Sequence, residues 1–262
     1  MPTLDDIIRT YGSIPPLTAF KKPMFVGPHP DDIEFGCGGL VSKLKETGAD
    51  VTYVIVTDGG AGTFDPAVTP GMMAETRKKE ALAAAEYLNV KNVEFLDLPD
   101  GGDYEAVDVI KALAPAVLKY QPDIIFAPDP KLKTECHPDH LKTGEAVRRL
   151  IQLVPYPESL RRHKINIDGV EVFPSNITLA FYFSDDCNVI EEISENDLNA
   201  KFQALMLHAS QMQDASSGLL INYFKLKALK LGERTSTGFA ENYQVLLPLV
   251  QHVFTEGIHY NA

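Results

Sequence analysis

Two short segments combine histidine and aspartate at a spacing that could support metal chemistry. The first is His29-Pro30-Asp31-Asp32, and the second is His137-Pro138-Asp139-His140. Neutral imidazole nitrogens and carboxylate oxygens together make a good site for a divalent metal, zinc above all. The segments therefore predict a metal-dependent active site. Their spacing alone leaves open whether Asp31 or Asp32 is the ligand.

The chemistry of such a site would be hydrolytic. Three protein ligands on zinc leave a fourth position for water, and zinc lowers the pKa of that water to about 7. A carboxylate beside the ligands could accept a proton as general base. A histidine that is not a ligand could stabilise an oxyanion or protonate a leaving amine. One HPDD segment alone could be a simple helix cap, but two such segments after predicted strands favour a metal or catalytic site.

Four apolar runs predict the strands that would position these segments. They are Met24–Gly27, Val51–Thr57, Val93–Leu96 and Ile124–Ala127. Helices are predicted between them at Gly39–Thr47, Met72–Leu88 and Ala106–Tyr120. This alternation predicts an α/β fold, a Rossmann-like three-layer α/β/α sandwich with a mostly parallel sheet. Ligands bind outside the carboxyl ends of strands in such a sheet, and both His/Asp segments follow a predicted strand.

After His140 the pattern is less regular. Further helices are predicted at His140–Leu153, Asp197–Ser210 and Leu219–Leu231, and further strands at Val170–Phe173 and Thr178–Phe183. The polar stretch Arg161–Gly169 is expected to be a loop or an extended excursion. We found no Gly/Ser-rich linker, repeat or low-complexity tract. We therefore expect a single domain over residues 1–262, with a C-terminal third from about residue 155 that decorates it.

Composition excludes several classes of function. The 262 residues include 36 Asp and Glu against 24 Lys and Arg, a formal net charge of −12. This balance argues against a broad surface for nucleic acid or anionic membranes. No run of apolar residues is long enough for a transmembrane helix, and the N-terminus lacks the features of a signal peptide. The three cysteines, an odd number, suit a reducing compartment. We therefore expect a cytoplasmic protein without membrane insertion.

At the two His/Asp segments the chain resembles the PIG-L/LmbE family of zinc-dependent N-deacetylases. The segments match the two principal motifs of that family. Weaker matches follow in the right order at Gly36–Gly39, Thr57–Gly59, Gly62–Thr63, Arg77–Glu80, Asp97–Gly101, His208–Gln211 and Ala240–Glu241. Pro128-Asp129-Pro130 followed by Glu135 is most similar to the diacetylchitobiose deacetylases. Some sugar-thiol deacetylases of the family have tyrosine at the position of Glu135, so that contribution to an oxyanion is not available here.

The resemblance implies a hydrolase that removes the N-acetyl group from a GlcNAc-type sugar or short chito-oligosaccharide, giving acetate and a free amino sugar. It implies zinc as cofactor, with another divalent metal as the alternative, held by His29, Asp32 and His140. It also implies a homo-oligomer, either a trimer or a hexamer, whose only other partner is this small-molecule substrate.

The resemblance also implies roles for five further residues. Asp31 would be the general base. His137 would stabilise the oxyanion and could act as general acid, with Asp139 orienting it. Arg77 and Asp100 would contact the sugar or a group attached to it. The residues by themselves show that these chemical groups are present, but not which role each group has.

Other interpretations use the same residues. The protein could be an amidase of an amino-sugar conjugate or a metal-dependent esterase. It could also be a metal- or sugar-binding protein without catalysis, although a binding module has no need for Asp31 and His137 together. We expect Glu34 to stabilise a helix N-terminus by its charge. His208 remains open between the rim of the active site and a packing role.

Overall fold

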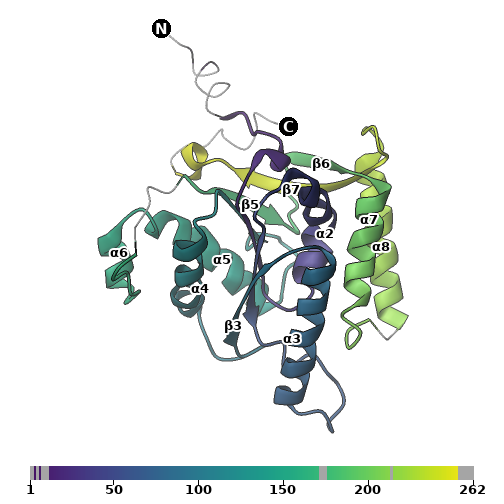
Figure 1. Ribbon diagram of the computed structural model, residues 1–262, viewed down its shortest axis with the longest axis horizontal. Coiled ribbons are helices and arrows are strands. Elements are labelled where there is room, and N and C mark those ends of the chain that lie inside the picture. The colour runs from purple at the N-terminus through teal and green to yellow at the C-terminus, as the bar shows by residue number, and fades with distance from the viewer. Residues whose placement is uncertain (1–2, 4–5, 7–11, 171–175, 213–214, 253–262) are drawn as a thin grey trace.

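The computed structural model describes residues 3, 6, 12–170, 176–212 and 215–252, and within them one mixed sheet organises the chain (Figure 1). Its seven strands are β1 (Pro23–Gly27), β2 (Thr52–Thr57), β3 (Asn92–Leu98), β4 (Ile124–Pro128), β5 (Thr178–Tyr182), β6 (Val189–Ile193) and β7 (Phe239–Leu246). Their order is β3-β2-β1-β4-β5-β7-β6. The first five pair in parallel, whereas β7 is antiparallel to both β5 and β6.

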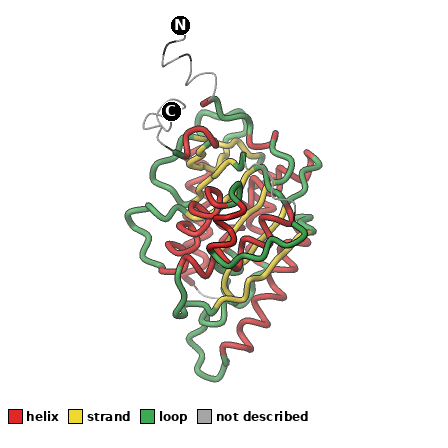
Figure 2. Tube along the Cα trace, turned by 90° about the vertical axis from the view of Figure 1, so that its left-hand side faces the viewer, coloured by secondary structure: helices red, strands yellow, loops and turns green. Residues whose placement is uncertain are grey.

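Helices lie on both faces of this sheet. The α-helices are α2 (Asp32–Leu44), α3 (Pro70–Tyr87), α4 (Ala106–Tyr120), α5 (Pro138–Leu153), α6 (Pro157–Arg162), α7 (Glu195–Met206) and α8 (Ala215–Gly232). Short 3₁₀ turns lie at Leu17–Ala19, Lys45–Thr47 and Pro248–Gln251. Helices α4 and α5 cover one face, and α2, α3 and α7 lie over the other, with α8 beside α7 and against β7 (Figure 1). In Figure 2, which looks from the side of α4 and α5, helices lie in front of the strands. The predicted three-layer α/β/α fold with a mostly parallel sheet is confirmed.

Continuous burial explains the apolar runs of the central strands. Every residue of β1, β2, β4 and β5 is buried, as expected for strands that are covered on both faces. One core cluster joins the sheet to α4 and α5, around residues such as Leu113 and Val147. A second cluster joins it to α2 and α7, around residues such as Leu40 and Ala204. These two cores fix the helices whose ends carry the His/Asp segments.

The start of α2 differs from the prediction of a helix over Gly39–Thr47. The helix begins at Asp32 and ends at Leu44, and Lys45–Thr47 form a 3₁₀ turn. The glycines therefore lie inside the helix. A Cβ on Gly36 would come within 2.5 Å of the Tyr182 ring, so glycine is needed here for close packing of α2 on β5.

The second half contains strands that the sequence pattern did not reveal. Strands β6 and β7 form the antiparallel edge, and β6 reads VIEEI, too polar for a buried run. The predicted strand Val170–Phe173 falls largely on residues outside those described. The first two residues of the expected loop Arg161–Gly169 end α6, and the rest of that stretch has neither helix nor strand.

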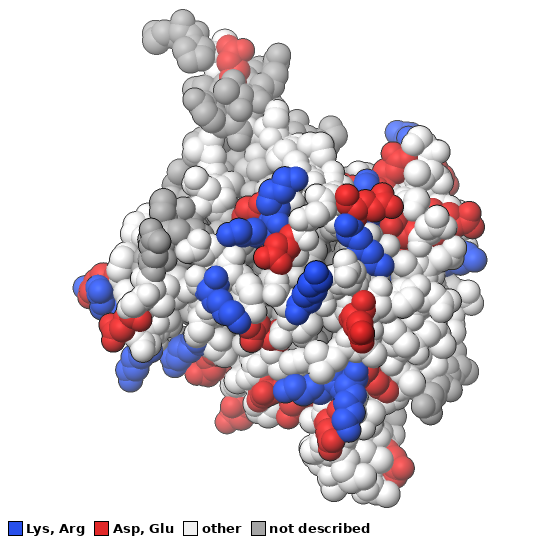
Figure 3. Space-filling model, viewed as in Figure 1, with Lys and Arg blue, Asp and Glu red and all other residues white. Residues whose placement is uncertain are grey.

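The described surface carries side chains of both charges. On the face seen in Figure 3, Lys and Arg side chains of the described residues alternate with Asp and Glu side chains. Among the described helices, none has the length and apolar character needed to cross a membrane. The cytoplasmic location and the homo-oligomer stay predictions.

Candidate active site

The two His/Asp segments meet where the direction of the sheet topology reverses. Strand β1 lies between β2 and β4, so the chain leaves β1 toward one side of the sheet and returns to its other side at β4. In open α/β sheets this reversal is the usual place for a ligand, beyond the carboxyl ends of the strands. The first segment follows β1, and the second, which comes after β4, forms the N-cap and first residues of α5. The β3–α4 loop brings Asp100 to the same place.

Three side chains from the two segments converge on one point. The Nδ1 atom of His29 lies 3.1 Å from Oδ2 of Asp32, and Nε2 of His140 lies 3.3 Å from the same oxygen. Zinc–nitrogen bonds are about 2.0–2.1 Å, so two ligand atoms on a tetrahedral ion lie about 3.3 Å apart. Both distances to the Asp32 oxygen therefore suit a tetrahedral ion, and the donor atoms of all three residues lie within 4.8 Å of one another. The predicted ligand set stays a prediction.

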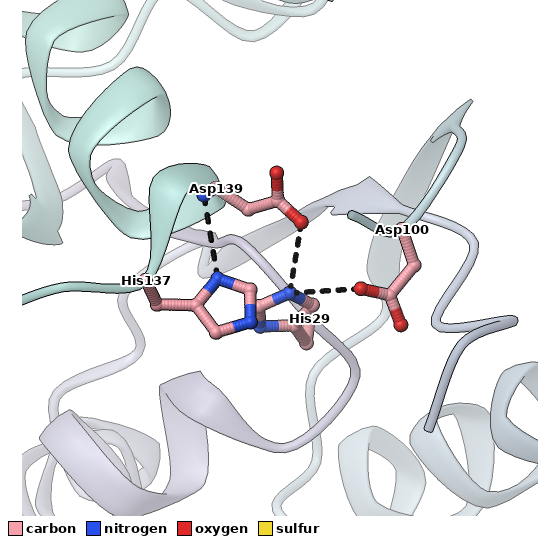
Figure 4. Close-up of side chains that lie close together, drawn as sticks. All are labelled: His29, Asp100, His137 and Asp139. Atoms are coloured by element: carbon pink, nitrogen blue, oxygen red, sulfur yellow. Dashed lines mark hydrogen bonds and ion pairs between the residues drawn. The ribbon is translucent and has the colours of Figure 1, made fainter. Parts of the chain in front are cut away.

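The opposite nitrogen of His29 belongs to a second group of acidic and histidine side chains. His29 Nε2 lies 3.3 Å from Oδ1 of Asp100 and 3.3 Å from Oδ2 of Asp139. Figure 4 shows these two contacts, with His137 beside them. Among the described residues, this group and the His29–Asp32–His140 group are the two that could hold a metal ion. A histidine whose outer nitrogen meets a carboxylate is the common arrangement around protein-bound metals.

The charges at the site favour a cation at its centre. Burial alone would lower the pKa of His29, but hydrogen bonds to Asp100, Asp139 and Asp32 outweigh it and raise that pKa to about 12. Burial likewise opposes the charge on Asp32, yet the His140 and His29 rings hold its pKa well below the ordinary value. The metal-free site thus attracts positive charge, which a divalent ion can supply in place of protons.

Asp31 occupies an unusual backbone position at the start of α2. Its φ is 128°, a region that residues other than glycine rarely adopt and that often marks functional sites. Burial raises the pKa of its carboxyl to about 6, although the neighbouring Arg77 guanidinium opposes that rise. A carboxylate with this pKa can both accept and release a proton near neutral pH.

Arg77 and Asp100, which we expected to contact substrate, both contact protein groups. The buried Arg77 guanidinium donates to the carbonyl oxygens of Pro30 (2.8 Å) and Gly59 (3.3 Å) and to Asp31 Oδ1 (3.2 Å). Asp100 accepts from the backbone N–H of Ala61 in addition to its contact with His29. These residues therefore organise the site itself, and their contact with substrate stays a prediction.

His137 is exposed and caps the N-terminus of α5. Its Nδ1 accepts a 3.3 Å hydrogen bond from the backbone N–H of Asp139, which leaves the ring proton of a neutral imidazole on Nε2. Burial and the nearby His29 and His140 rings lower the pKa of His137, which favours this neutral form. We expected Asp139 to orient His137; the structure shows a hydrogen bond from its backbone to the ring, and the orienting role stays a prediction. The Asp139 carboxylate instead contacts His29 and the N–H of Gly101.

Two contacts were not foreseen from the sequence. Oε2 of Glu135 lies 3.0 Å from Nδ1 of the predicted ligand His140. In the sequence, this contact could have been suspected from the position of Glu135 two residues before the second segment. His208 is completely buried, with Nε2 3.5 Å from the carboxylate of the buried Glu34, so it packs beneath the site and does not line its rim. Glu34 lies in the first turn of α2, as expected.

Comparison with known proteins points to one family. The family model described as PIG-L, GlcNAc-PI de-N-acetylase, matches residues 24–151, which include both His/Asp segments. The diacetylchitobiose deacetylase of Thermococcus kodakarensis is 31% identical over 91% of this chain and 88% of its own length. A probable N-acetyl-alpha-D-glucosaminyl L-malate deacetylase of Bacillus cereus is 29% identical over 74% of this chain and 84% of its own.

A solved structure extends the likeness to three dimensions. The N,N'-diacetylchitobiose deacetylase of Pyrococcus horikoshii, in complex with an inhibitor, superposes with a TM-score of 0.87. The superposition covers 97% of this chain and 97% of that protein at 28% sequence identity. The likeness thus includes the antiparallel edge of the sheet as well as the region of the two segments.

Proposed function

Since the chain belongs to the PIG-L family of de-N-acetylases, we propose that it is a metal-dependent hydrolase of N-acetylated amino sugars. Its substrate is a GlcNAc-type sugar or short chito-oligosaccharide, and its products are acetate and the free amine. One observation carries the proposal. The Asp31 carboxylate and the His137 ring lie beside the His29, Asp32 and His140 group that could hold a metal, in a chain that resembles a diacetylchitobiose deacetylase along 91% of its length.

His29, Asp32 and His140 are the proposed metal ligands, and zinc is the proposed metal. Three ligands leave a position open for a reacting molecule, as in catalytic zinc sites. The alternative group of His29, Asp100, His137 and Asp139 has four potential ligands and would close the coordination sphere. Moreover, Oδ2 of Asp139 already accepts from the Gly101 N–H. When bound, the metal polarises the acetyl carbonyl and lowers the pKa of water.

Asp31 is the proposed general base. Its carboxylate adjoins the ligand Asp32 in sequence and lies against Arg77 on its other side. The pKa of about 6 keeps Asp31 ionised at neutral pH while leaving it basic enough to take a proton from the attacking water. The proton held on Asp31 is then available for the departing amine.

His137 is the proposed donor to the developing oxyanion. Because its Nδ1 accepts from the Asp139 backbone, its Nε2–H points a hydrogen-bond donor away from the helix. The exposure of His137, unlike that of the buried His29, lets this donor reach a bound substrate. A donor aimed at the carbonyl oxygen stabilises the tetrahedral transition state of amide hydrolysis.

An acetate-release screen with metal analysis of the same samples tests the proposal. The panel pairs N-acetylglucosamine and N,N'-diacetylchitobiose with O-acetylated and N-acyl conjugate analogues. We expect release from the N-acetyl sugars, loss of activity after chelation and recovery with zinc. His140→Ala should lose the metal, whereas His137→Ala should keep it and lose turnover. Full zinc occupancy without turnover of any N-acetyl sugar would overturn the enzymatic proposal.

A further inference from the structure

We propose that Glu135 is a positioning residue that fixes the tautomer and the orientation of His140. This inference rests on the proposed function, in which His140 is a metal ligand. The carboxylate of Glu135 contacts the histidine on its outer nitrogen, opposite the atom that faces Asp32. Glu135 would therefore raise the affinity for metal without touching the ion.

One carboxylate of Glu135 holds both histidines of the second segment. Its Oε2 lies 3.0 Å from Nδ1 of His140, and its Oε1 accepts a 2.8 Å hydrogen bond from the backbone N–H of His137. The side chains of Glu135 and His140 are only 16% and 13% exposed, so little water competes for their contact. The relative position of the proposed ligand and the proposed oxyanion donor thus depends on a single side chain.

The negative charge of Glu135 affects which nitrogen of His140 carries the ring proton and therefore which nitrogen can bind a metal. The ring N–H of His140 is not aligned as a hydrogen bond to Glu135 in this structure, but a carboxylate 3.0 Å from a ring nitrogen favours the tautomer with the proton on that nitrogen. For His140 that nitrogen is Nδ1. The lone pair is then on Nε2, the atom 3.3 Å from Oδ2 of the proposed ligand Asp32. The carboxylate also makes the imidazole a stronger ligand by stabilising the proton on its far side.

The loop between β4 and α5 is built to hold Glu135 in place. At its start, the N–H of Asp129 donates to the carbonyl of Tyr182 on β5, and the Asp129 side chain accepts from the N–H of Lys131. At its end, the N–H of Glu135 donates 3.0 Å to the carbonyl of Leu132. These turns fix the backbone of Glu135, so that its side chain needs little further ordering to reach the two histidines.

Two substitutions of Glu135 separate the effect of its charge on zinc binding from the effect of its volume. In Glu135→Gln, the amide oxygen can accept from only one of the two donors, and the amide N–H₂ must face the other. Glu135→Ala removes both contacts. We expect Glu135→Ala to weaken zinc binding by about 10- to 100-fold, as for other residues behind metal-bound histidines, and Glu135→Gln to weaken it less. Competition against a chelator of known affinity measures this loss.

One control variant and two further measurements show whether a loss of zinc affinity comes from the altered contact with His140. Glu145→Gln, an exposed carboxylate on α5, is the matched control and should bind zinc like the unaltered protein. The visible absorption of the cobalt-substituted Glu135 variants should change, because the imidazole that binds the ion is reoriented. Thermal unfolding of the metal-free variants checks that the fold is retained. If Glu135→Ala does not fold, the zinc affinity of Glu135→Gln tests the proposal instead.

The control His140→Ala distinguishes two ways in which the proposal can fail. If Glu135→Ala and Glu135→Gln bind zinc as tightly as the unaltered protein while His140→Ala does not, His140 is a ligand and the role of Glu135 is wrong. If His140→Ala also retains full affinity, the ligand set is wrong, and the metal site of the proposed function fails with it.

Discussion

The Arg77 guanidinium and the Asp31 carboxylate form an ion pair of 3.2 Å at the base of the active site. The same Nη2 atom donates a 2.8 Å hydrogen bond to the carbonyl of Pro30, the residue before Asp31. Arg77 therefore holds the side chain of Asp31 and also the peptide just before it. Asp31 itself has a strained backbone, with φ of 128°. The single guanidinium of Arg77 couples α3 to the turn between β1 and α2.

The amide variant Asp31→Asn tests the general base. Asparagine keeps the size of the side chain and tolerates positive φ better than most residues, so the turn should survive. We expect kcat to fall by about 10²- to 10⁴-fold, because the amide cannot accept the proton. Metal content should stay unchanged. Initial rates of acetate release and elemental analysis measure both, with the exposed Asp185→Asn as control. Near-normal turnover would remove the assignment.

The pH dependence of kcat/KM follows from the raised pKa of Asp31. The base must be ionised, and burial places its pKa at about 6. As pH falls through this value Asp31 becomes protonated, so kcat/KM should drop by about tenfold per pH unit below it and level off above. Rates measured on both sides of the midpoint, at constant metal occupancy, check this. A profile without an acidic limb, or the same limb in Asp31→Asn, contradicts the prediction.

Substitution of Arg77 should affect turnover more than substrate binding. Arg77→Lys keeps the charge but cannot contact Pro30, Gly59 and Asp31 together. Displacement of Asp31 by about 1 Å could lower kcat by about 100-fold. Separate measurement of kcat and KM tests this, with the exposed neighbour Lys78→Met as control. A large rise in KM at unchanged kcat would show instead that Arg77 acts by contacting substrate.

A buried ion pair behind α2 should stabilise the fold. Lys201 Nζ lies 2.6 Å from Oε1 of Glu241, whose carboxylate also accepts from the N–H groups of Gly39 and Leu40. Lys201→Met leaves that carboxylate buried without its cation, which should reduce the free energy of unfolding by about 3–5 kcal/mol. Urea denaturation measures the loss, and adding Glu241→Gln should recover part of it.

An exposed ion pair supplies the comparison for Lys201. The side chains of Lys79 and Glu75 are both 72% exposed, so Lys79→Met should leave the denaturation midpoint almost unchanged. Equal midpoints for Lys201→Met and Lys79→Met would mean that the buried pair contributes nothing beyond a surface pair.

The contact between α5 and the end of β4 should be sensitive to a single methyl group. A Cβ on Gly144 would meet the carbonyl oxygen of Pro128 and come within 2.8 Å of Pro130 Cδ. Gly144→Ala should push α5 from the sheet, lower stability by about 1–3 kcal/mol and weaken metal binding at His140. Gly71→Ala is the control, because its added Cβ has nothing within 4 Å. Identical unfolding and zinc titrations for the two variants would rule out this close fit.

The central strands and the positions of both His/Asp segments were predictable because their signals are local. A run such as VTYVIV is apolar throughout because β2 is buried on both faces, and this is visible without knowledge of its neighbours. Strand β6 gave no comparable signal. It lies at the edge of the sheet and carries Glu191 and Glu192, so its pairing with β7 depends on a partner distant in sequence.

The sequence by itself determined which chemical groups are present and which strand each follows, and the family motifs assigned their roles. Only the tertiary structure decided that Arg77 clamps Asp31, that the Asp139 carboxylate turns to His29, 110 residues away, and that Glu135 faces the far nitrogen of His140. The physical reason is that residue spacing encodes the local conformation of the chain. The contacts of a side chain across the site depend instead on strand order and helix packing, which bring distant loops together.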